Sequence, residues 1–403
     1  MTMLSIVIPA YNEESGISDI MHRVLNVRSD LIDAGISDME LLIVNDGSKD
    51  RTAEIASEVA KNDTGVRVIS HQNNRGYGAA LKTGFAQARG DLVGFLDADG
   101  TYPPEFFPQL CREAMTGVDL VIGSRMAGAD SKMPITRRIG NTIFATLLSI
   151  LGWQRVTDSA SGMRVFRREI LAKLSPLPDG LNLTPVMSTR AVHEGIHMSE
   201  VPIPYSERVG RSKLSVVRDG TVFLQSMVLT VLSYNPVRVL GIVGLTGIGF
   251  AAIVGLGLVI ARLAGATSLG PWGVAALFTA LVSGVAGISL FALGATFNYL
   301  VSLFYEEPIR QGLFGKPVFK KPLENEFGWL GLLSFAIGII IGIISLIIGI
   351  SGDNIARMWL YLLGGALLTL AGVQLVIYWL LMRVLEELSQ RKAHTEQDLK
   401  GTL

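Results

Sequence analysis

Short apolar runs alternate with longer amphipathic segments over residues 4–125. The runs are rich in valine, isoleucine and leucine, and they occupy residues 4–10, 40–44, 66–70, 92–96 and 118–122. Runs of this length are typical of buried strands, and strands that alternate with helices usually pair in parallel. The pattern therefore predicts a Rossmann-like α/β domain around a mostly parallel sheet.

Four long apolar segments occupy most of the chain after residue 236. They cover about residues 237–261, 271–303, 329–351 and 356–382, and a membrane-spanning helix needs about 20 apolar residues. Lysine and arginine gather in the loop between the second and third segments and in the C-terminal tail, which favours a cytosolic location for both. The sequence therefore predicts an integral protein of a bacterial-type cytoplasmic membrane, with an α-helical transmembrane domain and both termini in the cytosol.

Residues 134–151 and 216–234 are amphipathic. In the first segment an apolar stripe recurs at helical spacing, and it consists of Ile135, Ile139, Ile143 and Leu147. Arg137 and Arg138 lie off this stripe. Two interpretations stay open: a helix packed on the domain, or an interfacial helix that brings arginines to lipid headgroups.

These patterns divide the chain into four expected parts. They are a cytosolic α/β domain over residues 1–213, an interfacial linker helix over 214–235, a transmembrane domain over 236–385 and a cytosolic tail over 386–403. Because the first residues lack a basic region and a cleavage site, we expect no signal peptide. The glycines of the apolar segments permit close helix packing, so a homo-oligomer is an open alternative to packing within one chain.

The amino-acid composition limits the classes of binding partner and the cellular compartment that are consistent with this chain. Hydrophobic residues make up 49% of the chain, and 35 basic residues balance 35 acidic ones. A balanced charge gives no support for a nucleic-acid partner, so any anion-binding surface must be built locally. Cys111 is the only cysteine, which excludes an intrachain disulfide and suits a reducing compartment.

Acidic residues follow the predicted strand at residues 92–96. Ligands of open α/β sheets bind at the carboxyl ends of strands, so this is where a site is expected. Asp97 and Asp99 lie two positions apart, and their carboxylates leave a strand end on the same side. Such a pair can hold Mg²⁺ or Mn²⁺, although a solvated turn or a helix cap would use the same residues.

Three further motifs precede this pair in the sequence. They are VIPAYNEE at residues 7–14, VNDGSKDRT at residues 44–52 and NNRGYGAA at residues 73–80. Together with the acidic pair they resemble the family 2 glycosyltransferases, which have the GT-A fold. The motifs GSR at 123–125, DSASGMR at 158–164 and RVGRSK at 208–213 narrow the resemblance to one branch. That branch contains dolichyl-phosphate mannose synthase and the bacterial polyprenyl-phosphate glycosyltransferases.

The resemblance implies an inverting transfer of a sugar from a UDP- or GDP-linked donor to a polyprenyl phosphate. It implies a donor site made by Pro9, Tyr11, Glu13, Val44, Asp46, Asp97, Ala98, Arg208 and Lys213. Asp46 would accept a hydrogen bond from the base, with an Asx turn at Gly47 as the alternative. Asp97 would face the ribose or the donor sugar, and Arg208 and Lys213 would close over the phosphates.

The same resemblance implies a metal and an acceptor site. Asp99 would bind the metal that bridges the diphosphate, and Asp97 is a further metal candidate. Many members have Gly-Gln after the acidic pair where this chain has Gly100-Thr101, so Thr101 would reach the metal only through a shorter hydroxyl.

Arg125, Arg137 and Asn141 would cradle the acceptor phosphate, with Arg138 as the alternative to its neighbour. Asp158 falls at a site aspartate of the branch. It would act as a base or as an orienting group, because the acceptor phosphate is already anionic near neutral pH.

Two other functions are consistent with the same architecture. A processive polysaccharide synthase also joins a GT-A domain to membrane helices, but the chain contains no Gln-x-x-Arg-Trp element. A non-catalytic membrane scaffold that binds nucleotide sugars has support only from Asn45, which stands where the family often has an acid, and from Thr101.

Overall fold

The structure is a computed structural model that describes residues 2–128, 133–152, 154–206, 216–305, 326–351 and 358–400. The chain divides into two compact units, Met1–Val231 and Leu232–Leu403.

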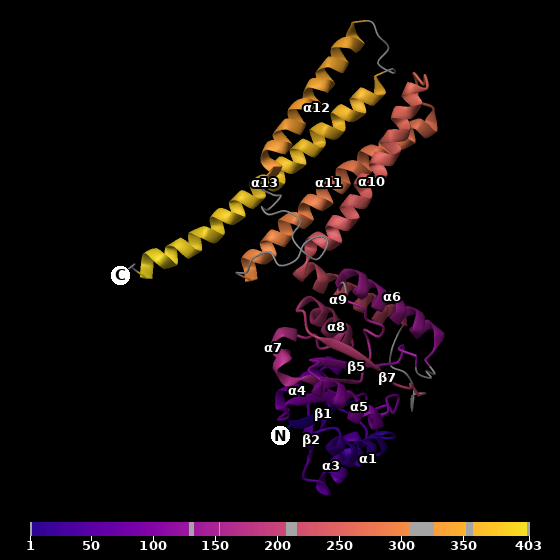
Figure 1. The fold of residues 1–403 in the computed structure, drawn as a ribbon, viewed down its shortest axis with the longest axis vertical. Coiled ribbons are helices and arrows are strands. Elements are labelled where there is room, and N and C mark those ends of the chain that lie inside the picture. Colours follow the sequence, from indigo (N-terminus) through magenta and orange to yellow (C-terminus); the bar gives the residue numbers. More distant parts are fainter. Residues whose placement is uncertain are drawn as a thin grey trace. The chain divides into compact units, whose positions relative to one another are not determined.

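Within the described residues, the first unit contains a seven-stranded sheet in the order β3-β2-β1-β4-β6-β5-β7 (Figure 1). Its strands are β1 (Thr2–Ala10), β2 (Ile36–Asn45), β3 (Val66–Ser70), β4 (Leu92–Phe95), β5 (Leu120–Ser124), β6 (Arg164–Arg167) and β7 (Met198–Pro202). Neighbouring strands pair in parallel except at β6, which runs antiparallel to both β4 and β5. The prediction of a mostly parallel α/β sheet is confirmed, and the five apolar runs correspond to β1 to β5.

Each face of the sheet is covered by helices (Figure 1). Because side chains alternate along a strand, Ile6 and Ile8 of β1 enter one hydrophobic core and Val7 enters the other. The first core is covered by α1 (Ile17–Asn26), α2 (Arg28–Asp33), α3 (Thr52–Lys61) and α5 (Phe107–Met115), which the short helix η1 (Pro104–Phe106) precedes. The second is covered by α4 (Tyr77–Gln87), α7 (Leu171–Leu174) and α8 (Leu183–His193), and η2 (Arg168–Ile170) leads into α7.

Cys111 lies on α5 inside the first core. Burial raises the pKa of its thiol to about 12, so the reactive thiolate is scarce at neutral pH. We expect iodoacetamide to leave native Cys111 unmodified and to alkylate it only after denaturation, as measured by mass spectrometry. A Ser29→Cys variant places a second thiol on the exposed surface as the control. Equal alkylation of Cys111 and the introduced thiol in the folded protein would contradict the prediction.

Two amphipathic helices, α6 (Ile135–Gly152) and α9 (Val216–Tyr234), lie beside α8. Leu148 of α6, Val192 of α8 and Met227 of α9 form a small buried cluster. The isoleucine stripe of α6 does not take part in this cluster and faces outward, because Ile135, Ile139 and Ile143 are 75%, 56% and 59% exposed. The helix therefore packs on the domain through a different face from its isoleucine stripe.

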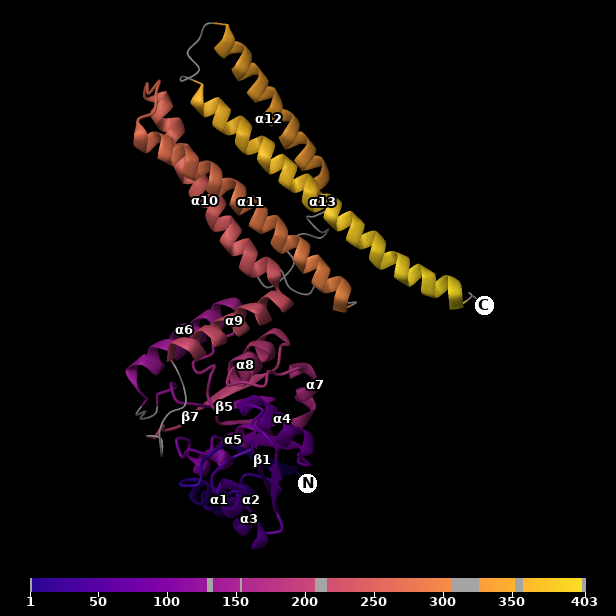
Figure 2. The same ribbon diagram turned by 180° about the vertical axis from the view of Figure 1, so that it is seen from behind.

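The second unit contains the helices α10 (Pro236–Leu263), α11 (Pro271–Tyr305), α12 (Phe327–Ile350) and α13 (Trp359–Lys400), which run alongside one another in pairs (Figure 2). In the described part of the chain, four helical stretches are long and apolar enough to cross a membrane, ending with Trp359–Leu388. Each of the four predicted apolar segments therefore forms a helix of sufficient length and apolar composition for a membrane span.

Glycines allow the paired helices to approach closely. A Cβ atom added to Gly244 of α10 would lie 2.6 Å from the carbonyl oxygen of Gly287 on α11. One added to Gly338 of α12 would lie 2.7 Å from the carbonyl oxygen of Gly365 on α13. These glycines therefore serve helix packing within one chain, which is one of the two alternatives that the sequence left open.

Candidate active site

The polar motifs meet at one edge of the sheet because β6 is reversed. The carboxyl ends of β1, β2 and β4 lie there, and Phe95 of β4 pairs with Arg164, the first residue of β6. Ile122 of β5 also pairs with Arg164, so the segment before β6 and the residues after β5 reach the same edge.

A cavity of about 620 Å³ lies at this edge. The predicted site residues that line it are Pro9, Tyr11, Glu13, Asp46, Asp97, Ala98, Asp99, Arg125, Arg137 and Asn141. Val44, Thr101 and Asp158 do not line it, and Arg208 and Lys213 lie outside the described residues.

The loops after β1 and β2 hold each other in place. The backbone N–H of Asn12 donates to the Ser48 hydroxyl at 3.0 Å, and the Lys49 N–H donates to Asn12 Oδ1 at 2.9 Å. Asn12 has a positive φ of 51°, a conformation that asparagine tolerates better than most residues. These bonds fix the chain around Tyr11 and Glu13 in the wall of the cavity.

Asp46 holds the loop that precedes α4. Its carboxylate accepts the backbone N–H groups of Arg75 at 2.9 Å and Gly76 at 2.8 Å, and it lies 2.7 Å from Nδ1 of His71. The carboxylate therefore binds the NNRGYGAA motif, in addition to lining the cavity. Val44 is fully buried in the second core, so its predicted contact with the base stays a prediction.

Asp97 is contacted from two sides. Tyr77, at the start of α4, donates its hydroxyl to Oδ1 at 2.8 Å. On the other side lies Gly162, where an added Cβ atom would meet Oδ2 at 2.6 Å. Burial raises the pKa of Tyr77 well above its ordinary value and the charge of Asp97 adds to this shift, so the hydroxyl keeps its proton.

Asp99 is oriented by Thr101. The Thr101 hydroxyl donates to Asp99 Oδ1 at 2.6 Å, and its backbone N–H donates to the same oxygen at 3.1 Å. Thr101 is buried and does not line the cavity. In this geometry it orients the Asp99 carboxylate and does not take the place of the glutamine that other family members have at this position.

The acids of the cavity fit a divalent metal that is shared with a ligand. Among the residues that the structure describes, no group of three or more acids, histidines or cysteines forms a complete metal site. Mg²⁺ is commonly bound by one or two carboxylates together with substrate phosphates. Asp97 and Asp99 are two positions apart in the sequence and both line the cavity, so they supply the one or two protein carboxylates of such a site.

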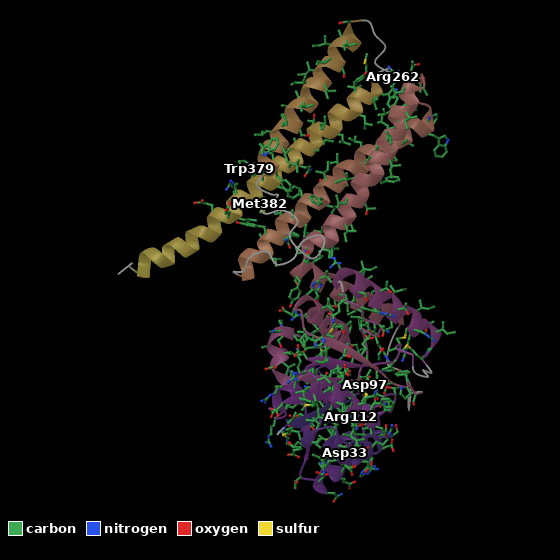
Figure 3. All side chains as sticks on the ribbon, viewed as in Figure 1. Asp33, Asp97, Arg112, Arg262, Trp379 and Met382 are labelled. Carbon is green, nitrogen blue, oxygen red and sulfur yellow. The ribbon has the colours of Figure 1, made fainter. Side chains whose placement is uncertain are left out.

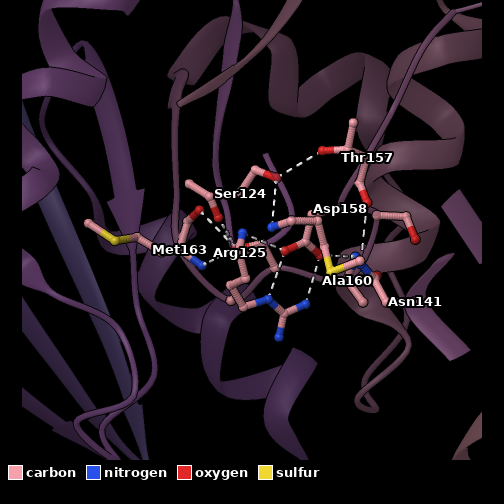
Figure 4. Close-up of polar contacts among 12 residues, drawn as sticks. Ser124, Arg125, Asn141, Thr157, Asp158, Ala160 and Met163 are labelled. Atoms are coloured by element: carbon pink, nitrogen blue, oxygen red, sulfur yellow. Dashed lines mark hydrogen bonds and ion pairs between the residues drawn. The ribbon is translucent and has the colours of Figure 1, made fainter. Parts of the chain in front are cut away.

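Arg125 and Asp158 form a buried ion pair (Figure 4). Nε and Nη2 of the guanidinium each donate to the carboxylate at 2.7 Å, and the Arg125 backbone N–H adds a bond at 3.0 Å. Burial raises the pKa of the Asp158 carboxyl, but the nearby guanidinium reverses this effect and holds it below the usual value. Since Asp158 is fully buried and outside the cavity wall, the geometry favours an orienting role over that of a base.

The same pair is supported from β7 and from two aromatic rings. Glu200 of β7 accepts the Thr157 hydroxyl and the backbone N–H of Asp158, the latter at 3.1 Å. The Arg125 guanidinium lies 5.7 Å from the ring centre of Tyr102 and 5.4 Å from that of Tyr205. Cation–π contacts and the ion pair together fix Arg125 at the cavity.

On α6, Arg137 lines the cavity and Arg138 is exposed away from it. Asn141 donates an N–H of Nδ2 to the Thr157 carbonyl at 3.3 Å (Figure 4), and its buried Oδ1 has no hydrogen-bond partner among the described residues. The amide nitrogen carries two N–H donors and this bond uses one of them, so the contact of Asn141 with the acceptor phosphate stays a prediction.

Comparison with known proteins agrees with this geometry. The family described as Glycosyl transferase family 2 matches residues 5–175. The chain is 34% identical to a dolichyl-phosphate hexose transferase of Haloferax volcanii, over 56% of this chain and 92% of that protein. It is 32% identical to an undecaprenyl-phosphate 4-deoxy-4-formamido-L-arabinose transferase of Pseudomonas aeruginosa, over 77% of this chain and 89% of that protein.

The chain belongs to the family 2 glycosyltransferases. The resemblance to the polyprenyl-phosphate branch is thereby confirmed. The membrane helices of this glycosyltransferase match a second family, described as a domain of unknown function (DUF8752), over residues 236–396.

Among solved structures, the glycosyltransferase is similar to glucosyl-3-phosphoglycerate synthase from Mycobacterium tuberculosis in complex with Mn²⁺, uridine diphosphate and glucosyl-3-phosphoglycerate. The TM-score is 0.43 at 24% identity, and the match covers 58% of this chain and 80% of that chain.

Sequence reasoning missed several residues of the glycosyltransferase site. Tyr77 and Gly162 lie within two of the quoted motifs, so their presence there was the available signal. Tyr102 and Tyr205 line the cavity beside Arg125 without belonging to any motif. No periodicity or spacing could have identified these two rings, because only the fold brings them together, with their ring centres 5.6 Å apart.

Proposed function

We propose that this glycosyltransferase transfers a sugar from a UDP- or GDP-linked donor to a polyprenyl phosphate at the cytosolic membrane face, with inversion. The observation that carries the proposal is the cavity itself, which has the carboxylates of Asp97 and Asp99 and the guanidinium of Arg125 in its wall. The carboxylates suit a metal-bound diphosphate, and the guanidinium suits a phosphate monoester.

In the proposed reaction an oxygen of the acceptor phosphate attacks the anomeric carbon, a new carbon–oxygen bond forms, and the nucleoside diphosphate leaves. A divalent metal, when bound at Asp99, neutralises charge on the leaving diphosphate. Asp99 is kept in place by Thr101, and Arg125 by Asp158. Because the acceptor is already anionic, the reaction needs positioning more than a strong base.

The proposed acceptor also accounts for the apolar features of the first unit. Phe144, Leu181 and Phe223 line the cavity, and the isoleucine stripe of α6 is exposed. We assign the stripe to the membrane interface, where α6 would bring the cavity to the lipid acceptor. In this assignment residues 1–213 form the cytosolic domain and 214–235 the linker.

Membranes that contain the full chain should convert labelled nucleotide sugars and undecaprenyl phosphate to a labelled lipid. We expect the product to require Mg²⁺ or Mn²⁺ and to disappear with a chelator, as measured by organic extraction. A panel of UDP- and GDP-sugars that gives no lipid product with either metal would refute the proposed function.

A further inference from the structure

The orientation of the Asp97 carboxylate is set by two residues that are far apart in the sequence. Tyr77 donates to its Oδ1, and Gly162 lies against Oδ2 and Cγ, at 2.6 and 2.8 Å from an added Cβ atom. We propose that Tyr77 and Gly162 are positioning residues that hold Asp97 in the orientation required for sugar transfer. This inference rests on the proposed function and names residues that act through Asp97 without needing to touch the substrates.

The start of α4 fixes Tyr77. Asp46 accepts the backbone N–H groups of Arg75 and Gly76, which are the two residues before it. Gly78, the residue after it, is pressed against the chain before α8, because an added Cβ atom would lie 2.2 Å from the Pro178 carbonyl oxygen. The backbone on both sides of Tyr77 is therefore held, and its hydroxyl is directed at Asp97.

The direction of the hydrogen bond between Tyr77 and Asp97 is defined by the chemistry of the two groups. The Tyr77 hydroxyl donates in this bond, because a carboxylate can only accept it. A bond to a charged acceptor is shorter and stronger than one between neutral groups, which suits a fixed orientation.

Gly162 is fixed from the other direction. Its backbone N–H donates to the Tyr102 hydroxyl at 2.7 Å, and the neighbouring Ser161 hydroxyl donates to the Gly123 carbonyl at 2.6 Å. The buried guanidinium of Arg164 donates to the carbonyl oxygens of Ser159 and Ser161 at 2.9 and 3.1 Å. These hydrogen bonds hold the backbone at Gly162, so an added side chain is accommodated mainly by movement of the Asp97 carboxylate.

The segment 158–164 also reaches the acceptor side of the cavity. Asp158 at its start pairs with Arg125, and Gly162 near its end contacts Asp97. Tyr102 links the two sides, since its hydroxyl accepts the Gly162 N–H and its ring centre lies 5.7 Å from the Arg125 guanidinium. One segment thus sets the positions of a donor-side carboxylate and an acceptor-side guanidinium.

Two variants separate the two contacts. Tyr77→Phe removes only the hydroxyl, and Gly162→Ala introduces a methyl group that must displace the Asp97 carboxylate. A displacement of about 1 Å in a reacting geometry costs up to about 100-fold in rate, so we expect kcat to fall about 10- to 100-fold in each variant. The donor KM should change by less than about threefold, because orientation is lost and not uniform binding.

The test uses the full chain in membranes, with undecaprenyl phosphate and the labelled UDP- or GDP-sugar that supports transfer by the wild type. Binding of UDP and GDP with Mn²⁺ is measured by calorimetry on the purified chain, and thermal unfolding is followed for every variant. The matched controls are Gly249→Ala, where an added Cβ atom meets nothing within 4 Å, and Tyr361→Phe at an exposed position on α13. Both controls should retain the wild-type kcat.

The outcomes distinguish the inference from the function on which it rests. A lower kcat with nearly unchanged KM, nucleotide binding and unfolding temperature supports the positioning role. An active wild type whose Tyr77→Phe and Gly162→Ala variants keep kcat within about threefold overturns the inference alone. A joint loss of kcat, nucleotide binding and thermal stability also overturns it, since the role would then be structural. If the wild type transfers no sugar from any donor, the proposed function fails and the inference falls with it.

Discussion

Replacing Asp99 by asparagine is expected to lower kcat by about 1,000-fold, because the variant keeps the shape of the side chain and loses the charge that binds the metal. A metal at a developing negative charge contributes several kcal/mol to a barrier, and about 4 kcal/mol corresponds to this factor. The Thr101 hydroxyl can still donate to the amide oxygen, so local structure should survive. The measurement is lipid-product formation over a titration of Mn²⁺ or Mg²⁺.

Asp33→Asn provides the matched control. Asp33 is exposed on α2 and lies well away from Asp97 (Figure 3). We expect this variant to keep the wild-type rate and metal dependence. An Asp99→Asn enzyme with the same kcat and the same metal requirement as the wild type would show that Asp99 is not the metal ligand.

Replacing Asp158 by alanine is expected to destabilise the first unit by about 3–5 kcal/mol, because it leaves the Arg125 guanidinium buried without its partner. Transfer should also be lost, since Arg125 is no longer held beside Tyr102 and Tyr205. Cys111 supplies the readout: its alkylation by iodoacetamide at increasing urea reports unfolding of the core in which it lies.

The control for this variant is Glu54→Ala, which breaks the exposed ion pair with Arg51. We expect no change in the urea midpoint of Cys111 alkylation, because exposed pairs contribute little. An unchanged midpoint in Asp158→Ala would instead show that the buried pair does not support the fold.

The pair also has a defined pH dependence. The folded pKa of Asp158 is depressed, so its contribution to stability is fully present above the unfolded value of about 3.9 and is lost as the pH falls through the folded value. The destabilisation caused by Asp158→Ala should therefore be constant near neutral pH and should shrink only below about pH 4.

The sequence predicted those features that depend on local pattern. Apolar runs identified β1 to β5, and long apolar segments identified the four membrane helices, because burial in a sheet or a bilayer requires a continuous local composition. The acidic pair was found in the same way, since Asp97 and Asp99 directly follow a strand that the pattern identified.

The sequence did not predict β6, which has only four residues, Arg164–Arg167, and no apolar run of its own. It also left the direction of the α6 stripe open, because the period of a helix identifies its faces but not their partners. Only packing shows that Leu148 enters the small core while Ile135, Ile139 and Ile143 remain exposed.

The acidic pair, the DSASGMR motif and their order along the chain were determined by the sequence alone. The tertiary structure decided what they do to one another: the reversal of β6 brings Asp158 to Arg125 and Gly162 to Asp97. Tyr77 and Tyr102 enter the same arrangement from separate segments. The physical reason is that these contacts depend on how strands pair across the sheet. Strand pairing joins residues that are far apart in the sequence, and no local sequence pattern records which of them will meet.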